Sequence, residues 1–194
     1  MTYVIRQMLP DELPVFFRRI EEDFPEEEYA PFPVLDSHLR RGVQEGLVLC
    51  AEGQDIAYAI NAVAENGFVL ISLMAVSKEY RGRGIGSAFI RMMKERYAGK
   101  KGIILEVERP DKAECGRELF TMKQRIAFYE RLGFHLVPGI DYWIWNVRMH
   151  LMALPLTESA ASIDAQIEEI VTGIYLGLLG ERLIAKLDIR RVDG

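Results

Sequence analysis

Short apolar runs alternate with turn residues through the middle of the chain. The runs at 47–51 and 56–64 are separated by Gly53-Gln54-Asp55. A third run, 68–76, follows Asn66-Gly67. Runs of this length between turn residues predict strands, and Asn-Gly is a strong hairpin signal. The centre of the chain is therefore expected to form antiparallel strands.

Other segments repeat their apolar residues with the period of a helix or a strand. The helices are expected to begin near Pro10, with Asp11 as the N-cap, and then to cover residues 35–44, 87–97 and 118–132. The strands are expected at residues 3–8, 103–107, 134–137 and, as one long strand, 143–154. Together these elements predict an α/β fold, a mixed sheet with helices packed against it.

Helical spacing returns after Pro155, in a segment with its own apolar face. Its apolar residues are Ile163, Ile167, Ile170, Val171, Ile174, Leu178 and Leu179. We expect a domain over residues 1–155 and a helical extension over 156–194. The extension either packs on its own domain or serves as a dimer contact or a lid. Gly173, Gly177 and Gly180 weaken the helix and indicate close packing or a break.

Composition narrows the classes of function. The chain has 194 residues, of which 49% are hydrophobic, so it can bury a sizeable core. Its net charge of −5 argues against non-specific nucleic-acid binding, which needs a basic surface. Cys50 and Cys115 are isolated and the three histidines are scattered, so no metal site is expected. No signal peptide or membrane-length apolar run is evident, which favours a cytoplasmic protein.

A basic glycine turn follows the apolar run at 68–76 and precedes a helical pattern. The turn and helix start read Arg81-Gly82-Arg83-Gly84-Ile85-Gly86-Ser87. A glycine turn at a helix start offers free backbone N–H groups to an anion, and arginine adds donors for phosphate oxygens. The segment lacks the Lys-Ser or Lys-Thr of a P-loop, and its glycine spacing differs from the dinucleotide fingerprint. It therefore predicts a site for some other phosphorylated ligand.

The pattern Arg81-x-x-Gly84-x-Gly86 resembles the acetyl-CoA pyrophosphate loop of the GNAT superfamily of N-acetyltransferases. Downstream, Tyr129-x-x-x-Gly133-Phe134 is similar to the second signature of that family, at the end of a helix. The two signatures stand in the family order with a strand between them. The resemblance implies the GNAT fold, acetyl-CoA as co-substrate, and a small-molecule amine or a protein amine as acceptor. A homodimer is compatible with it.

The resemblance also implies roles for individual residues. The backbone of one strand, Leu73, Met74, Ala75 and Val76, would bind the pantetheine arm of CoA. The amides of Arg81, Gly82, Arg83, Gly84, Ile85, Gly86 and Ser87 would hold the pyrophosphate. Tyr129 would protonate the departing thiolate, since a phenol carries its proton at pH 7.

The general base is expected at Glu106, in a strand sequence similar to that of members whose glutamate acts as base. Alternation places Glu106 and Glu108 on one face of the strand. The competing interpretation is that both face solvent or pair with arginines. Asp141 and Glu52 are weaker candidates for the base.

Three further features depart from the family pattern or vary within it. Members often carry asparagine and alanine where Met122 and Arg125 stand. Arg125 therefore contacts a CoA phosphate or an acidic acceptor, or is simply an ion-paired helix residue. The stretch 109–120 is expected to shape the acceptor pocket. The acidic segment 21–28 either attracts a cationic acceptor or is a solvated helix end.

Two classes of function remain open from the sequence. The leading one is N-acetyl transfer from acetyl-CoA to a primary amine. The alternative is a non-catalytic acyl-CoA-binding sensor or subunit that retained the loop and lost the chemistry.

Overall fold

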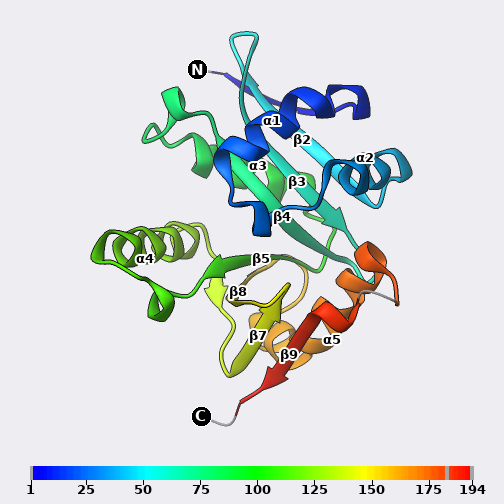
Figure 1. Cartoon of the computed structure of the whole chain (residues 1–194), viewed down its shortest axis with the longest axis vertical. Coiled ribbons are helices and arrows are strands. Elements are labelled where there is room, and N and C mark those ends of the chain that lie inside the picture. The colour runs from blue at the N-terminus through cyan, green and yellow to red at the C-terminus, as the bar shows by residue number, and fades with distance from the viewer. Residues whose placement is uncertain (1, 182–183, 193–194) are drawn as a thin grey trace. The chain divides into compact units, whose positions relative to one another are not determined.

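The computed structural model describes residues 2–181 and 184–192 (Figure 1). Residue 1 of the expected domain lies outside the described residues. So do residues 182–183 and 193–194 of the expected extension. The described chain forms two compact units, which are taken in turn. One comprises the residues up to 63 together with 71–96, and the other comprises 64–70 and the residues from 97 onward.

The first unit is a set of strands with helices on both faces. Its helices are α1 (Leu13–Asp23), α2 (Phe32–Arg41) and α3 (Ile85–Arg96), and its strands are β1 (Tyr3–Gln7), β2 (Gln44–Ala51), β3 (Gln54–Val63) and the later part of β4 (Phe68–Val76). The strand order is β1-β2-β3-β4, and β1–β2 and β2–β3 pair antiparallel. Tyr58 and Ile60 of β3 belong to the core cluster that α1 and α2 cover. The adjacent Asn61 donates to Met93 of α3, so α3 lies on the opposite face of β3 (Figure 1).

The second unit is an antiparallel sheet with two long helices. Its helices are α4 (Gly116–Glu130) and α5 (Ala160–Leu179), and its strands are β5 (Gly102–Glu108), β6 (His135–Leu136), β7 (Ile140–Ile144), β8 (Val147–Pro155) and β9 (Leu187–Arg191). The order is β5-β8-β7-β9, with β6 also paired to β8. The first residues of β4 belong to this unit as well. The expected α/β fold, a mostly antiparallel sheet flanked by helices, is confirmed.

The single strand expected over 143–154 is wrong. The segment is a hairpin of β7 and β8, joined at Trp145-Asn146. These two residues have φ of +52° and +68°. Two consecutive left-handed residues match the twist of paired strands, but the turn is usually built from Asn-Gly or Asp-Gly. A tryptophan in the first position carries no sequence signal for a turn.

The expected N-cap at Asp11 is also wrong. Residues Pro10–Glu12 form a short 3₁₀ turn before α1, and Asp11 pairs with Arg40 instead. Glu12 is the residue that serves this turn, since its Oε2 accepts from the Leu9 N–H at 2.8 Å. Strand β9 was not expected from the sequence, although apolar and polar residues alternate over its first four positions.

The expected close packing in the C-terminal helix is confirmed at one glycine. A Cβ added at Gly173 would lie 2.9 Å from Asn66 Nδ2, whereas one at Gly177 would meet nothing within 4 Å. The Asn66 amide donates to the Ile170 carbonyl at 3.0 Å, which ties α5 to the turn before β4. Helix α5 ends at Gly180.

Candidate active site

The glycine loop between β4 and α3 has the conformation of an anion-binding turn. Gly82 and Gly84 have φ of +75° and +76°, which strongly favour glycine. Helix α3 begins at Ile85, and its first internal bond runs from Ala88 N–H to the Gly84 carbonyl at 3.0 Å. The N–H groups of Ile85, Gly86 and Ser87 therefore lack acceptors within the helix. Residues 81–84 are exposed, so these donors stand beside an open loop.

The two loop arginines have different surroundings. Arg81 Nε donates to the Val76 carbonyl at 2.9 Å, and its Nη2 pairs with Asp23 Oδ1 at 2.7 Å. Asp23, with a side chain only 9% exposed, also accepts from the Tyr58 hydroxyl at 3.2 Å. Arg81 thus fastens the loop to the end of α1. The Arg83 guanidinium lies 5.9 Å from the Tyr80 ring centroid.

The strand before the loop alternates between core and partly exposed residues. Leu73 and Ala75 are buried in the core cluster, whereas Met74 and Val76 are partly exposed. The Ser77 N–H beyond the strand donates to the Ile56 carbonyl at 2.9 Å. The four strand residues expected to bind pantetheine therefore lead directly into the glycine loop, within the first unit.

Glu106 lies in β5 of the second unit and is held by two tyrosines. The hydroxyls of Tyr142 on β7 and Tyr175 on α5 both donate to its Oε1, the latter at 2.7 Å. Burial raises the pKa of Glu106 above its ordinary value, and the two phenols partly offset that rise. Burial, and then the nearby carboxylate, raise the pKa values of Tyr142 and Tyr175 well above the ordinary phenol range. Both tyrosines therefore remain protonated donors.

Glu108 and Arg125 form an ion pair between β5 and α4. Their side chains are 26% and 43% exposed. Of the roles considered for Arg125, the structure shows the ion-paired helix residue. Glu106 lies two residues earlier on the same face of the strand. Unlike Glu108, it makes no ion pair with a described residue and is bound by tyrosine hydroxyls instead.

Tyr129 lies in the last turn of α4, among aromatic rings. Its ring centroid is 5.0 Å from that of Phe128 and 5.5 Å from that of Phe134. Gly133, with φ of +97°, lets the chain turn back so that the Phe134 N–H donates to the Tyr129 carbonyl at 3.2 Å. Burial raises the pKa of Tyr129 to about 12. Its hydroxyl forms no hydrogen bond with any described residue, and the residue as a whole is partly exposed.

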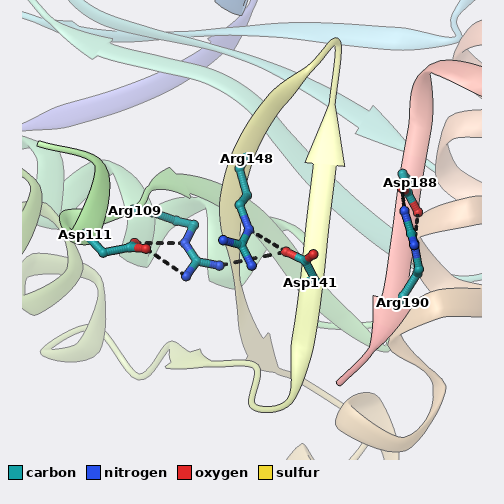
Figure 2. Close-up of polar contacts among 6 residues, drawn as sticks. All are labelled: Arg109, Asp111, Asp141, Arg148, Asp188 and Arg190. Carbon is teal, nitrogen blue, oxygen red and sulfur yellow. Dashed lines mark hydrogen bonds and ion pairs between the residues drawn. The ribbon is translucent and has the colours of Figure 1, made fainter. Parts of the chain in front are cut away.

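The weaker candidates for the base are placed elsewhere. Asp141 pairs with Arg148 at 2.5 Å and lies 4.0 Å from Arg109, within the network drawn in Figure 2. The hydrogen bond from Arg148 is the main cause that lowers the pKa of Asp141, so this carboxylate is a poor proton acceptor. Glu52 is exposed in the β2–β3 turn of the first unit.

The start of the stretch expected to shape the acceptor pocket is tied down by ion pairs. Arg109 also binds Asp111 at 2.9 Å (Figure 2). Residues Pro110–Lys112 form a 3₁₀ turn, and α4 begins at Gly116. Much of the stretch 109–120 is therefore helical or braced.

Sequence reasoning missed the two tyrosines and Asp23. Tyr175 follows the buried Val171 by one turn on the same face of α5, where a polar-tipped residue among aliphatic ones is the available signal. Tyr142 lies in β7, one residue before the strand that was expected over 143–154. In the first unit, Arg81 of the glycine loop is bound to Asp23. In the second unit, Glu106 is bound to Tyr142 and Tyr175.

The described residues include neither a metal-binding cluster nor a membrane-spanning helix. They contain no cluster of three or more His, Cys, Asp or Glu side chains placed to hold a metal ion. No helix among them has the length and apolar character required to span a membrane.

A model of a known protein family matches the middle of this chain. The model of the family described as "Acetyltransferase (GNAT) domain" matches residues 44–136. Over these residues the chain is similar to GNAT acetyltransferases. The matched residues include the glycine loop, Glu106 and Tyr129, whereas Tyr142 and Tyr175 lie beyond them.

One curated relative matches part of this chain at low identity. The chain is 25% identical over 127 residues to YjbC of Bacillus subtilis (strain 168), which is described as a candidate acetyltransferase. That match covers 66% of this chain and 60% of YjbC, so the chain spans less than two thirds of that relative's length.

Solved GNAT structures share the fold. A candidate GNAT-family acetyltransferase from Bacteroides thetaiotaomicron superposes with a TM-score of 0.74 at 22% identity, over 91% of this chain and 98% of that one. The ribosomal-protein-S18-alanine N-acetyltransferase of Escherichia coli gives a TM-score of 0.57 at 21% identity, over 82% and 97%. At these identities the likeness establishes the fold.

Proposed function

We propose that this protein transfers the acetyl group of acetyl-CoA to a primary amine. The observation that carries the proposal is the glycine loop, whose left-handed Gly82 and Gly84 open α3 within a GNAT domain. The free amides of Ile85, Gly86 and Ser87 would bind the pyrophosphate of CoA. Arg81 would act mainly by fixing the loop, because its guanidinium is already bound to Asp23 and Val76.

The chemistry needs a neutral amine, a thioester and a proton for the leaving thiolate. The amine nitrogen forms a bond to the acetyl carbonyl carbon as the C–S bond breaks, and the amine proton passes to Glu106. A carboxylate whose pKa is raised by burial is a better base near neutral pH than an exposed one. Tyr129 then gives its hydroxyl proton to the thiolate. Its hydroxyl has no other partner among the described residues, which leaves it available for this role.

The proposal extends to the arrangement of the chain. Residues 1–155 would carry the transferase domain, and the extension from 156 would support it through α5. The acceptor would be a small-molecule or protein amine. The acidic segment 21–28 and the stretch 109–120 remain the candidate sources of acceptor preference.

Calorimetric titration of acetyl-CoA into the wild type and Gly84→Glu tests the cofactor site. The glutamate should abolish binding, because it introduces a negative charge and a side chain where the pyrophosphate would lie. Gly53→Glu is the matched control. Gly53 has φ of +77° and no atoms within 4 Å of an added Cβ, as Gly84 has none, so both variants carry the same backbone strain.

The outcomes separate the candidate functions. Acetyl-CoA binding by the wild type and Gly53→Glu, but not by folded Gly84→Glu, supports the cofactor site, with ATP and NADH as specificity controls. No binding to the folded wild type overturns the proposal. Binding without thiol release in a screen of primary amines would favour the non-catalytic acyl-CoA sensor.

A further inference from the structure

Glu106 is bound asymmetrically. Both tyrosine hydroxyls donate to the same carboxylate oxygen, Oε1, and no described residue donates to Oε2. Tyr142 comes from β7 and Tyr175 from α5, which are 36 and 69 residues along the chain from Glu106. The carboxylate is thus fixed by one oxygen and free at the other.

Helix α5 is anchored firmly enough to hold Tyr175 in place. The Ser159 hydroxyl accepts from the Ser162 N–H at 3.1 Å and caps the start of the helix. His135 of β6 pairs with Asp164 at 2.7 Å, in the first turns. Ile163 is fully buried and packs against Gly102 of β5. A Cβ added at Gly102 would lie only 3.0 Å from the Ile163 side chain. The helix therefore docks on the strand that carries Glu106.

We propose that Tyr142 and Tyr175 are positioning residues that hold Glu106 through Oε1, so that Oε2 is the atom that accepts the amine proton. The inference rests on the proposed acetyl transfer and assigns a part of it to the C-terminal helix. The proton moves from the amine nitrogen to Oε2 as the nitrogen–carbon bond forms. The phenols keep their own protons throughout, because their pKa values lie well above neutrality.

The electrostatic surroundings of Glu106 are simple. On its own strand, the nearest acidic residue on the same face is Glu108, which is neutralised by Arg125 of α4. From β7 and α5 the groups that bear on its pKa are Tyr142 and Tyr175, and no charged side chain of residues 2–181 or 184–192 contributes. Each phenol stabilises the ionised carboxylate, so removing one should raise the pKa of Glu106 further.

The test follows Glu106 directly, by NMR titration of the full-length protein labelled with ¹³C at glutamate side chains. The Glu106 signal is assigned by its loss in Glu106→Gln. A hydrogen bond to a charged group corresponds to roughly one pH unit of pKa, so Tyr175→Phe and Tyr142→Phe should each raise the pKa by about that amount. Tyr58→Phe is the matched control, because it removes a tyrosine–carboxylate bond to Asp23 in the first unit.

Activity then separates positioning from simple packing. The rate of thiol release is measured against pH with acetyl-CoA as donor and water as acceptor. For Tyr175→Phe, the pH below which this rate falls should be higher than in the wild type by the same amount. The Kd for acetyl-CoA should match that of the wild type. An unchanged Glu106 pKa in both folded phenylalanine variants overturns the inference, as does a shifted pKa with an unmoved acidic limb. Failure of the wild type to bind acetyl-CoA would instead overturn the proposed function.

Discussion

At the scale of single residues, the carboxylate and the phenol that we propose for proton transfer have contrasting surroundings. Glu106 is surrounded by hydrogen-bond donors at one oxygen, whereas the Tyr129 hydroxyl has no partner among the described residues. Both residues were predicted from the sequence by their place in family-like signatures. Their partners were not, because Tyr142 and Tyr175 reach Glu106 only through contacts distant in sequence.

Replacement of Tyr129 by phenylalanine tests the proposed acid. Loss of general acid catalysis is expected to lower kcat by about 10²- to 10⁴-fold. The Kd for acetyl-CoA should remain within about twofold, since the ring and its aromatic contacts are kept. Thiol release with an amine found in the acceptor screen measures kcat, and calorimetry measures Kd. A variant with wild-type kcat would remove Tyr129 from the mechanism.

The rate of thiol release at alkaline pH offers an independent check on Tyr129. Because the pKa of Tyr129 is about 12, its proton remains in place across neutral and mildly alkaline pH. The rate of thiol release should therefore show no loss attributable to this phenol below about pH 10. A limb near pH 9 that disappears in Tyr129→Phe would contradict this assignment.

At the scale of elements, local signals were sufficient for most strands and helices and failed where tertiary contacts decide. Strand β4 has the bounds expected from its apolar run. The turn at Trp145-Asn146 was missed because its left-handed residues are not glycine. Strand β9 was missed because it is short and is defined by its pairing with β7, which is distant in sequence.

The two glycines inside α5 should respond oppositely to alanine. Gly177→Ala is expected to stabilise the protein by about 0.8–1 kcal/mol through helix propensity, because the added methyl meets open space. Gly173→Ala gains the same propensity but forces Asn66 away and breaks its bond to Ile170. It should therefore be less stable than Gly177→Ala.

Chemical denaturation monitored by circular dichroism measures this pair. Equal stabilisation by the two alanines would mean that Asn66 yields at no cost. In that case the contact between α5 and the turn before β4 would contribute little to stability.

At the scale of the whole molecule, the family signature covers residues 44–136, yet the Glu106 site is completed from outside that range. The sequence predicted the GNAT fold because its two motifs are local. It left the role of residues 156–194 open between packing, dimerisation and a lid. The structure places α5 against β5 within one unit, which is the packing alternative.

Glu106 and Asp141 should affect global stability with opposite dependences on pH. Burial raises the pKa of folded Glu106 above its unfolded value, so its favourable contribution is present at low pH and is lost as pH rises. Arg148 lowers the pKa of Asp141, so its contribution is present at neutral pH and is lost on acidification.

Thermal unfolding from pH 2 to pH 8 tests both signs, because the lowered pKa of Asp141 places its transition at the acidic end of this range. Relative to the wild type, the Tm of Glu106→Gln should rise with increasing pH. The Tm of Asp141→Asn should fall relative to the wild type over the same range. A parallel response of the two variants would contradict the assigned causes of the pKa shifts.

The anchoring of Glu106 by Tyr175 also has a consequence for the order in which the protein matures. The glycine loop and all of α3 have been synthesised by residue 96, but the second phenol of the carboxylate site follows only at residue 175. A nascent chain, or one cleaved after residue 155, would keep its cofactor loop while lacking half of the support for its base. The competence to bind a donor would therefore precede the competence to use it.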